Sequence, residues 1–205
     1  TTSASTRKPS RRTPCPVPPE GRAVGDVISV GEQYYILARS SLAEEQSRVL
    51  KQGDSFGIFD RHGDIRPRGV ENHGLFHDGC RYLSRFTLTV DKKTPLLLSS
   101  TVKEDNDLLT VDMTNPDILA EDGSVIRRGQ IYIGRSIFLW SGRCYEQFTL
   151  TNFGHTVVRF PISLRYEADY VDIFEVRGVQ RPRRGLLLPS DVTGNQAVLG
   201  YLGLD

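Results

Sequence analysis

The sequence has few cysteines, no long apolar segment and almost no net charge. Its three cysteines are an odd number spread along 205 residues, unlike the dense, paired pattern of a disulfide framework or zinc site. No apolar run approaches the roughly 20 residues that cross a bilayer, and the N-terminus lacks the apolar core of a secretory signal. A formal net charge of +1 provides no general attraction to nucleic acid or an anionic membrane. We therefore expect a cytoplasmic protein that binds neither.

The composition also limits the cofactor chemistry. Cys15 stands in a proline-rich stretch and should be an exposed thiol, whereas Cys80 and Cys144 are predicted to be small buried side chains. The sequence contains no glycine-rich phosphate loop between a strand and a helix, and no Gly-x-Ser-x-Gly turn. We expect no cofactor, no metal and no disulfide.

Residues 1–24 differ in composition from the rest of the chain. They are rich in Pro, Ser, Thr and Arg and carry too little apolar surface to offset the entropy of ordering, so we expect a disordered tail. The basic cluster around Arg7 and Arg12 could be an arm for nucleic acid or membrane, but a solvated linker is the favoured interpretation. Residues 25–205 are then the folded domain, and residues 1–19 should not be needed for its folding.

The domain is predicted to be all-β, a large antiparallel two-sheet β-sandwich. Alternation of apolar and polar residues is clearest in Tyr82–Val90 and in Gly129–Trp140, where Ile131, Arg135 and Leu139 share one face with two further isoleucines. A weak helical pattern covers 41–50, and the loop at 152–155 is expected to close a hairpin. The other predicted strands are Val27–Val30, Tyr34–Ala38, Ser55–Asp60, Leu96–Val102, Leu108–Met113, Cys144–Asn152 and Thr156–Glu167.

One stretch has the residue types of a metal site. His73 and His77 are four residues apart and are followed by Asp78 and Cys80. They could bind a metal if they shared a helical face, but the glycines at 74 and 79 disfavour a helix. The favoured alternative is that Asp78, with Arg81 close behind it, is a buried polar anchor that fixes the loop before the next strand.

A second stretch is rich in acids. Glycosidases need two carboxylates on opposite sides of the scissile bond. Asp169, Asp172 and Glu175 come from one short segment, so they cannot by themselves surround a sugar. Ion pairs with Arg177 are the favoured interpretation; a stand-alone enzyme would need a second acid such as Glu146 or Asp78. We assign no catalytic residue.

Arginine and aromatic residues could form a sugar-binding platform. Aromatic rings stack on pyranose rings, although such residues are more often found in the cores and rims of sheets. No substrate-binding residue is assigned from this pattern. The residues considered are Arg81, Tyr82, Arg135, Trp140 and Tyr145.

Four segments in order carry a resemblance. They read GLFHDGCRYLSR (74–85), PLLLSSTV followed by TNPD (95–102 and 114–117), YEQFTLTN (145–152) and ADYVDIFEVRG (168–178). Together they resemble the N-terminal domain of bacterial and archaeal glycogen debranching enzymes (amylo-α-1,6-glucosidases), over about 36–205. The resemblance implies a β-sandwich that precedes an (α/α)₆ toroid, and this toroid carries the catalytic carboxylates that cleave α-1,6 branches.

This resemblance leads to an expectation for function. The toroid needs several hundred further residues, so the chain should be a non-catalytic domain whose partner is its own (α/α)₆ domain, with α-glucan as a second potential ligand. It would help to shape the substrate cleft. The alternatives are an independent carbohydrate-binding or scaffold module, and a stand-alone enzyme that uses Asp169 or Asp172.

Overall fold

The computed structural model describes residues 27–30, 33–36, 47–67, 72–120 and 123–204. The chain divides into two units, 1–40 and 41–205. In the first unit, β1 (Val27–Val30) and β2 (Gln33–Ile36) form the expected antiparallel pair. The predicted tail, residues 1–24, lies outside the described residues.

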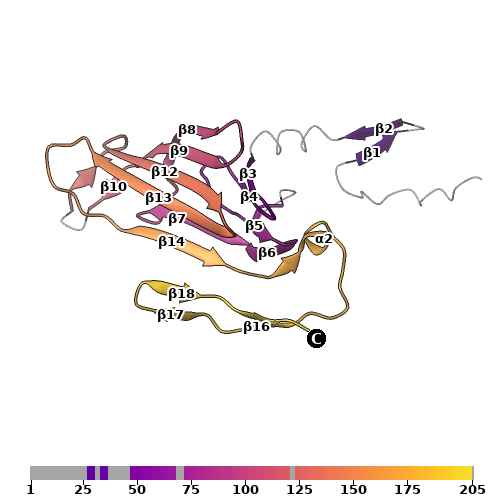
Figure 1. The fold of residues 1–205 in the computed structure, drawn as a ribbon. Coiled ribbons are helices and arrows are strands. Elements are labelled where there is room, and N and C mark those ends of the chain that lie inside the picture. Colours follow the sequence, from indigo (N-terminus) through magenta and orange to yellow (C-terminus); the bar gives the residue numbers. More distant parts are fainter. Residues whose placement is uncertain (1–26, 31–32, 37–46, 68–71, 121–122, 205) are drawn as a thin grey trace, which may run out of the picture. The chain divides into compact units, whose positions relative to one another are not determined.

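The second unit is an all-β fold of antiparallel sheets (Figure 1), as the alternating pattern predicts. A four-stranded sheet has the order β13 (Arg143–Asn152), β12 (Ile131–Trp140), β9 (Leu108–Thr114) and β8 (Leu96–Val102). A five-stranded sheet has the order β15 (Val171–Asp172), β6 (Cys80–Leu83), β5 (Gly74–His77), β4 (Ser55–Phe59) and β3 (Arg48–Gln52). Strand β7 (Arg85–Val90) pairs with β14 (Ile162–Glu167).

Short elements complete the second unit. Strands β10 (Ile118–Leu119) and β11 (Val125–Ile126) pair beside the sandwich, and α2 (Ile173–Val176) is a single helical turn. No helix among the described residues is long and apolar enough to cross a membrane. The C-terminal strands are β16 (Leu186–Leu187), β17 (Asp191–Thr193), β18 (Gln196–Val198) and β19 (Tyr201–Leu202).

The core fills the space between the four-stranded sheet and strands β3, β4 and β7. On β12, every second residue from Ile131 to Leu139 is buried, and these side chains join those of β9 against Leu50, Phe59 and Leu88. The period-two pattern of the sequence predicted this buried face correctly, including the unusual position of Arg135 within it. Burial of such apolar surface is the main favourable term in folding.

The structure corrects three predicted elements. Tyr82–Val90 is two strands, because the chain leaves the five-stranded sheet at Ser84 and then pairs with β14; the Ser84 N–H donates to the Glu167 carbonyl oxygen over 2.9 Å. Only 162–167 of the predicted strand Thr156–Glu167 is extended, and it pairs with β7 rather than closing a hairpin with β13. Of the predicted helix at 41–50, residues 48–50 belong to β3, and 41–46 lie outside the described residues.

Asn115 holds in place the segment between β9 and β12, which contains β10 and β11. Its side chain is fully buried, accepts a hydrogen bond from the Ile131 N–H (2.7 Å) and donates to the carbonyls of Pro116 (2.7 Å) and Arg127 (2.9 Å). Just beyond it, Asp117 accepts a hydrogen bond from the Arg128 N–H at 2.8 Å. The segment TNPD therefore satisfies backbone groups that have no strand partner.

We predict that Asn115→Ala lowers the free energy of unfolding by about 2–3 kcal/mol, because it leaves buried backbone groups without partners. Urea unfolding monitored by circular dichroism measures the change. Asn152→Ala is the matched control, since Asn152 is exposed and water can replace its bonds; a loss as small as that of the control would contradict the role of Asn115.

Candidate functional site

The acidic segment is engaged in ion pairs and helix capping. Asp169 accepts two hydrogen bonds from Arg81, at 3.1 Å from Nε and 2.5 Å from Nη2. Asp172 and Glu175 form the capping box of α2: Asp172 accepts from the Phe174 N–H (2.8 Å), and Glu175 accepts from the N–H of Asp172 (3.2 Å). These contacts occupy the carboxylates with local structure.

The prediction that Arg177 forms the ion pairs of this acidic segment is wrong. Arg181 lies 2.9 Å from Asp172, and Arg184 lies 3.5 Å from Glu175, so these arginines and Arg81 form the ion pairs predicted for Arg177. The reason is that α2 turns the chain back, which brings residues after the helix to its acidic side. All three acids lie near one another in sequence and pair with structural arginines.

The two histidines lie in different surroundings. His73 is buried, whereas His77 is half-exposed and its Nδ1 lies 2.8 Å from the Ser55 hydroxyl. The prediction that Asp78 is a buried anchor is wrong: it occupies a turn with a φ of 47°, and its side chain is 72% exposed. Cys80 and Cys144 are free thiols, and burial raises the pKa of Cys144 to about 12. Among the described residues, no group of three or more such side chains is placed to hold a metal.

Ser55, His77 and Asp78 form a contact that the sequence did not reveal. The His77 Nε2 lies 3.5 Å from the Asp78 carboxylate, so the three side chains are in the order of a Ser-His-Asp triad. Ser55 is 4% exposed and borders a cavity of about 50 Å³, far below the roughly 300 Å³ at which small-molecule sites begin. The pair joins β4 to β5 and does not form an acyl-transfer site.

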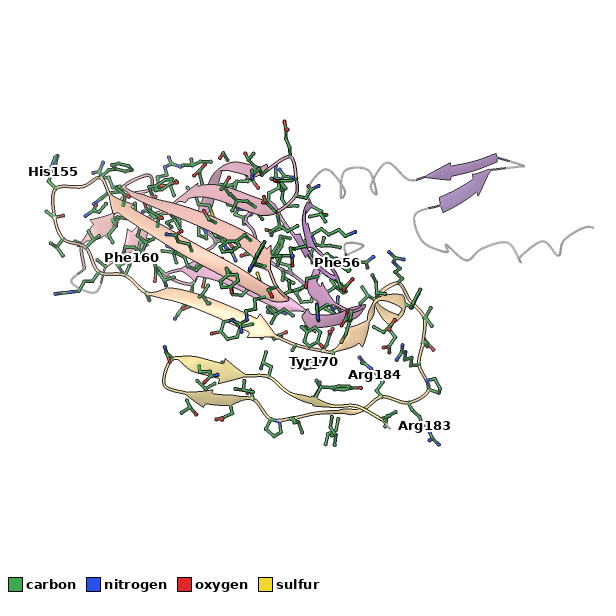
Figure 2. The ribbon with its side chains drawn as sticks, viewed as in Figure 1. Phe56, His155, Phe160, Tyr170, Arg183 and Arg184 are labelled. Carbon is green, nitrogen blue, oxygen red and sulfur yellow. The ribbon has the colours of Figure 1, made fainter. Side chains whose placement is uncertain are left out.

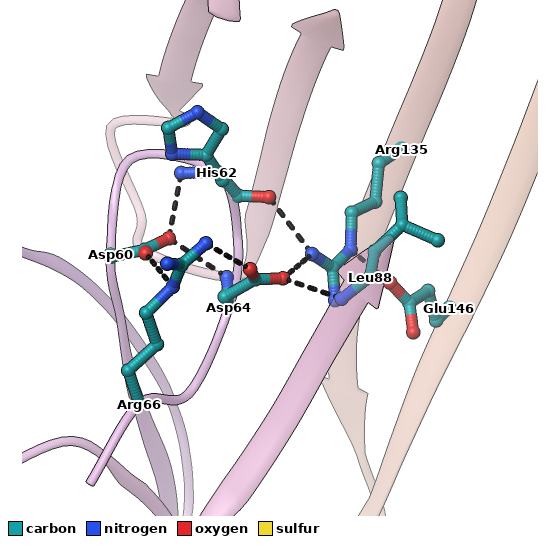
Figure 3. A network of polar contacts seen from close by, with 7 residues as sticks. All are labelled: Asp60, His62, Asp64, Arg66, Leu88, Arg135 and Glu146. Atoms are coloured by element: carbon teal, nitrogen blue, oxygen red, sulfur yellow. Dashed lines mark hydrogen bonds and ion pairs between the residues drawn. The ribbon is translucent and has the colours of Figure 1, made fainter. Parts of the chain in front are cut away.

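Glu146 and Arg135 belong to a buried network (Figure 3). The Arg135 side chain is 0% exposed; its Nη1 donates to Asp64 at 2.7 Å and to the His62 carbonyl at 2.8 Å, and its Nε donates to Glu146. Asp64 also accepts from the Leu88 N–H at 3.1 Å. The network therefore ties the loop after β4 to strands β7, β12 and β13.

In this network, two carboxylates contact one buried guanidinium group. Asp64 and Glu146 share the guanidinium of Arg135, while Arg66 binds Asp64 from the other side at 2.7 Å. Burial, and to a smaller extent repulsion by Asp64, raise the pKa of Glu146 above its usual range in spite of the arginine. The rings of Phe86 and Phe148 lie 5.2 and 5.7 Å from the guanidinium and shield it from water.

The residues considered for a sugar platform separate into two groups. Arg81 is bound to Asp169, Arg135 is buried, and Tyr82 contacts the ring of Tyr170 edge-on at 5.6 Å. Trp140 and Tyr145, by contrast, are exposed on the outer face of the four-stranded sheet. Tyr82 is also 44% exposed, on β6; of these residues, Trp140 and Tyr145 are the two that share the outer face of the four-stranded sheet.

The C-terminal strands form a two-stranded ribbon. Strand β16 pairs with β19 and β17 with β18, in antiparallel register. Tyr170 anchors the ribbon (Figure 2): its hydroxyl donates to the Leu199 carbonyl at 2.5 Å, and its ring stacks on Tyr201 at 5.3 Å. Tyr170 has a φ of 51°, which is rare for a bulky residue, so the contacts of its side chain maintain a strained backbone.

The ribbon exposes apolar side chains to an unusual extent. We call its exposed residues, together with those of β14, the C-terminal apolar surface. An isolated two-stranded ribbon is marginal in water, and large exposed apolar patches mark interaction sites. Its residues, all more than 40% exposed, are Ile162, Leu164, Tyr166, Leu186, Leu187, Leu188, Val192, Val198, Leu202 and Leu204.

Comparison with known proteins gives one match. A family model described as the N-terminal domain of (some) glycogen debranching enzymes matches residues 50–205, about three quarters of the chain. No curated protein and no solved structure matches. The matched range contains the Arg135 network and the C-terminal apolar surface, and the match confirms the resemblance predicted from the four sequence segments.

We predict that Arg135→Met lowers the free energy of unfolding by about 3–5 kcal/mol, because Asp64 and Glu146 would be left buried without their common cation. Chemical denaturation measures this loss. The control is Arg165→Met, which removes an exposed pair with Glu167 and should cost less than about 1 kcal/mol. Equal losses in the two variants would contradict the central role of Arg135.

Glu146→Gln should show a pH-dependent difference from the wild type. The raised pKa of Glu146 means that the folded state binds a proton more tightly than the unfolded state. As pH rises above the ordinary value of 4.5, the wild type should therefore lose stability relative to the variant, until the raised folded pKa has been passed. Paired urea titrations between pH 4 and 8 measure the difference, and a constant difference would contradict the direction of the shift.

Proposed function

We propose, because the chain belongs to the family of N-terminal domains of glycogen debranching enzymes, that it is a non-catalytic domain of such an enzyme. Its partner is an (α/α)₆ catalytic domain of the same protein. The domain packs against this partner and contributes to the rim of the substrate cleft. The whole enzyme would hydrolyse α-1,6 branches of glycogen in the cytoplasm.

The C-terminal apolar surface is the observation that carries this proposal. Leu186 and Leu202 are cross-strand partners, and they are 63% and 62% exposed. Leucines in such a position cost free energy in water and gain it when another surface covers them. A partner domain that covers the ribbon explains why its apolar residues are present.

The carboxylates support a non-catalytic role. Asp169 is bound by Arg81, and Asp172 and Glu175 cap α2, so each of them already has a structural partner. Cleavage of a glycosidic bond needs an acid and a second carboxylate on opposite sides of that bond. We propose that the catalytic domain supplies both, and that the chain alone releases no glucose from a branched α-1,6 substrate.

The association with the catalytic domain can be tested with a double substitution that introduces opposite charges on the ribbon while preserving the strand pairing. In Leu186→Lys with Leu202→Asp, the new side chains face each other and can form a cross-strand ion pair. We expect the wild-type chain to form a complex with the (α/α)₆ domain of a debranching enzyme whose own N-terminal domain has been deleted. The double variant should bind at least about tenfold more weakly, as expected when two buried leucines become charged. Analytical ultracentrifugation measures the complex.

The chain offers a matched control. Leu119 and Val125 are also cross-strand partners, 66% and 60% exposed, on the β10–β11 pair. Leu119→Lys with Val125→Asp makes the same chemical change away from the ribbon and should leave the association intact. Equal binding by the two double variants, or no complex with the wild type, would contradict the proposed interface.

A further inference from the structure

The outer face of the four-stranded sheet differs from the C-terminal apolar surface. Strand β12 places its even-numbered residues there, opposite the buried odd-numbered set. Those from Tyr132 to Phe138 each have a cross-strand partner on β9 and another on β13, whereas Trp140 has its partner, Arg143, on β13. The face therefore consists of regular rows of three side chains, and the composition of these rows changes along the strand.

At one end, a tyrosine ring lies over a glycine. A Cβ atom at position 134 would lie 2.9 Å from the hydroxyl oxygen of Tyr132 and 3.1 Å from its Cε1, so glycine leaves the space that this ring occupies. The Tyr132 hydroxyl donates to Asp112 at 2.6 Å, which holds the ring in place. Glycine within a strand is unfavourable in itself, and here it makes room for a ring fixed against the sheet.

At the other end, three aromatic side chains meet at a hairpin. Phe138 and Tyr145 are cross-strand partners whose rings stack in parallel, with centroids 4.8 Å apart and an interplanar angle of 9°. Trp140 is two residues along the same face and is 63% exposed. The turn at Ser141 and Gly142 has a φ of 50° and 70°, the type I′ geometry that joins two strands directly. It fixes the position of Trp140 at the end of the face.

Small neutral polar groups lie between the two aromatic ends. Ser136 has Thr110 and Gln147 as its partners, and Thr149 lies beside Gly134. Phe138 is six positions after Tyr132 along the extended strand, which corresponds to about 20 Å at ~3.3 Å per residue. The face thus presents hydroxyl and amide groups over the length of a short oligomer, with aromatic rings at each end.

The face has little charge. Of the side chains that the described strands β8, β9, β12 and β13 place on it, only those of Asp112 and Arg143 are of types that carry a charge at neutral pH. Hydrogen bonds from Ser99 (2.5 Å) and then from Tyr132 hold the pKa of Asp112 below its usual range and occupy its carboxylate. A neutral ligand matches this surface, whereas nucleic acid would require a cluster of cations.

We propose that this outer face binds a linear segment of α-glucan, with Tyr132 at one end and Phe138, Tyr145 and Trp140 at the other. The C–H groups of a pyranose ring form an apolar face that packs on an aromatic ring, and its hydroxyls require neutral donors and acceptors. The choice of α-glucan among neutral sugars rests on the proposed function. The face then holds an outer chain of the polymer while the partner domain acts on a branch.

The chain contains a direct reporter, because Trp140 is its only tryptophan. We expect maltoheptaose and glycogen to change the fluorescence of Trp140 in a saturable manner in the 205-residue chain. Affinity electrophoresis in gels that contain glycogen provides a second readout that works without tryptophan. In that assay, Trp140→Ala and Tyr132→Ala should each weaken binding by roughly tenfold or more, as expected for an aromatic anchor.

Phe174→Ala is the matched control, since Phe174 is an aromatic residue 60% exposed on α2, which is not part of the four-stranded sheet. It should bind glycogen like the wild type, and thermal unfolding of all variants should confirm the fold. Unchanged fluorescence with both sugars, equal retardation of all variants, or equal affinity for cellohexaose would each overturn the proposal. If the chain did not bind glucan but still associated with the catalytic domain, the proposed function would stand and the proposed glucan-binding face would not. The two proposals are therefore tested separately.

Discussion

The buried guanidinium of Arg135 is the constraint on which the sandwich depends. It lies in a row of isoleucines on β12 and is neutralised by Asp64 and Glu146, which come from a loop and from a neighbouring strand. A buried charge is tolerated only when it is paired and hydrogen-bonded, so these segments must meet in one arrangement. Removal of the arginine alone is costly, but replacement of a whole buried ion-pair network by apolar residues of similar volume is often neutral or stabilising. The network is therefore better explained by the register that it specifies for these strands than by a net gain in stability.

The two sides of the four-stranded sheet consequently have separate roles. The inner side is occupied by the core and by the Arg135 network, and its side chains are unavailable to any ligand. The side chains of the outer side are not part of the core, so packing does not require them to be apolar. They include aromatic rings and neutral hydroxyl groups. Since successive side chains of a strand point to opposite faces, Arg135 and Ser136 can belong to two different functions.

The C-terminal apolar surface is the basis of the proposed association with a partner domain. Its leucines lie on a two-stranded ribbon that Tyr170 holds, and the acids beside that tyrosine stabilise the helical turn that leads into the ribbon. The segment ADYVDIFEVRG thus holds the ribbon through Tyr170, while its acids are engaged by Arg81 and by the cap of α2. A docking surface and a glucan-binding face on separate elements would allow one domain to position both a partner and a polymer.

The sequence by itself determined the all-β class, the buried face of β12 and the family, because strand periodicity and ordered motifs are local properties. It did not determine which strands pair: β14 joins β7 across more than 70 residues, and no local signal encodes that contact. The pairing of Asp169 with Arg81 and of Arg135 with Asp64 was hidden for the same reason, since these ion pairs join residues 88 and 71 positions apart in sequence. Only the tertiary structure decided that Tyr132 lies over Gly134, because this contact depends on the hydrogen bond to Asp112 on another strand.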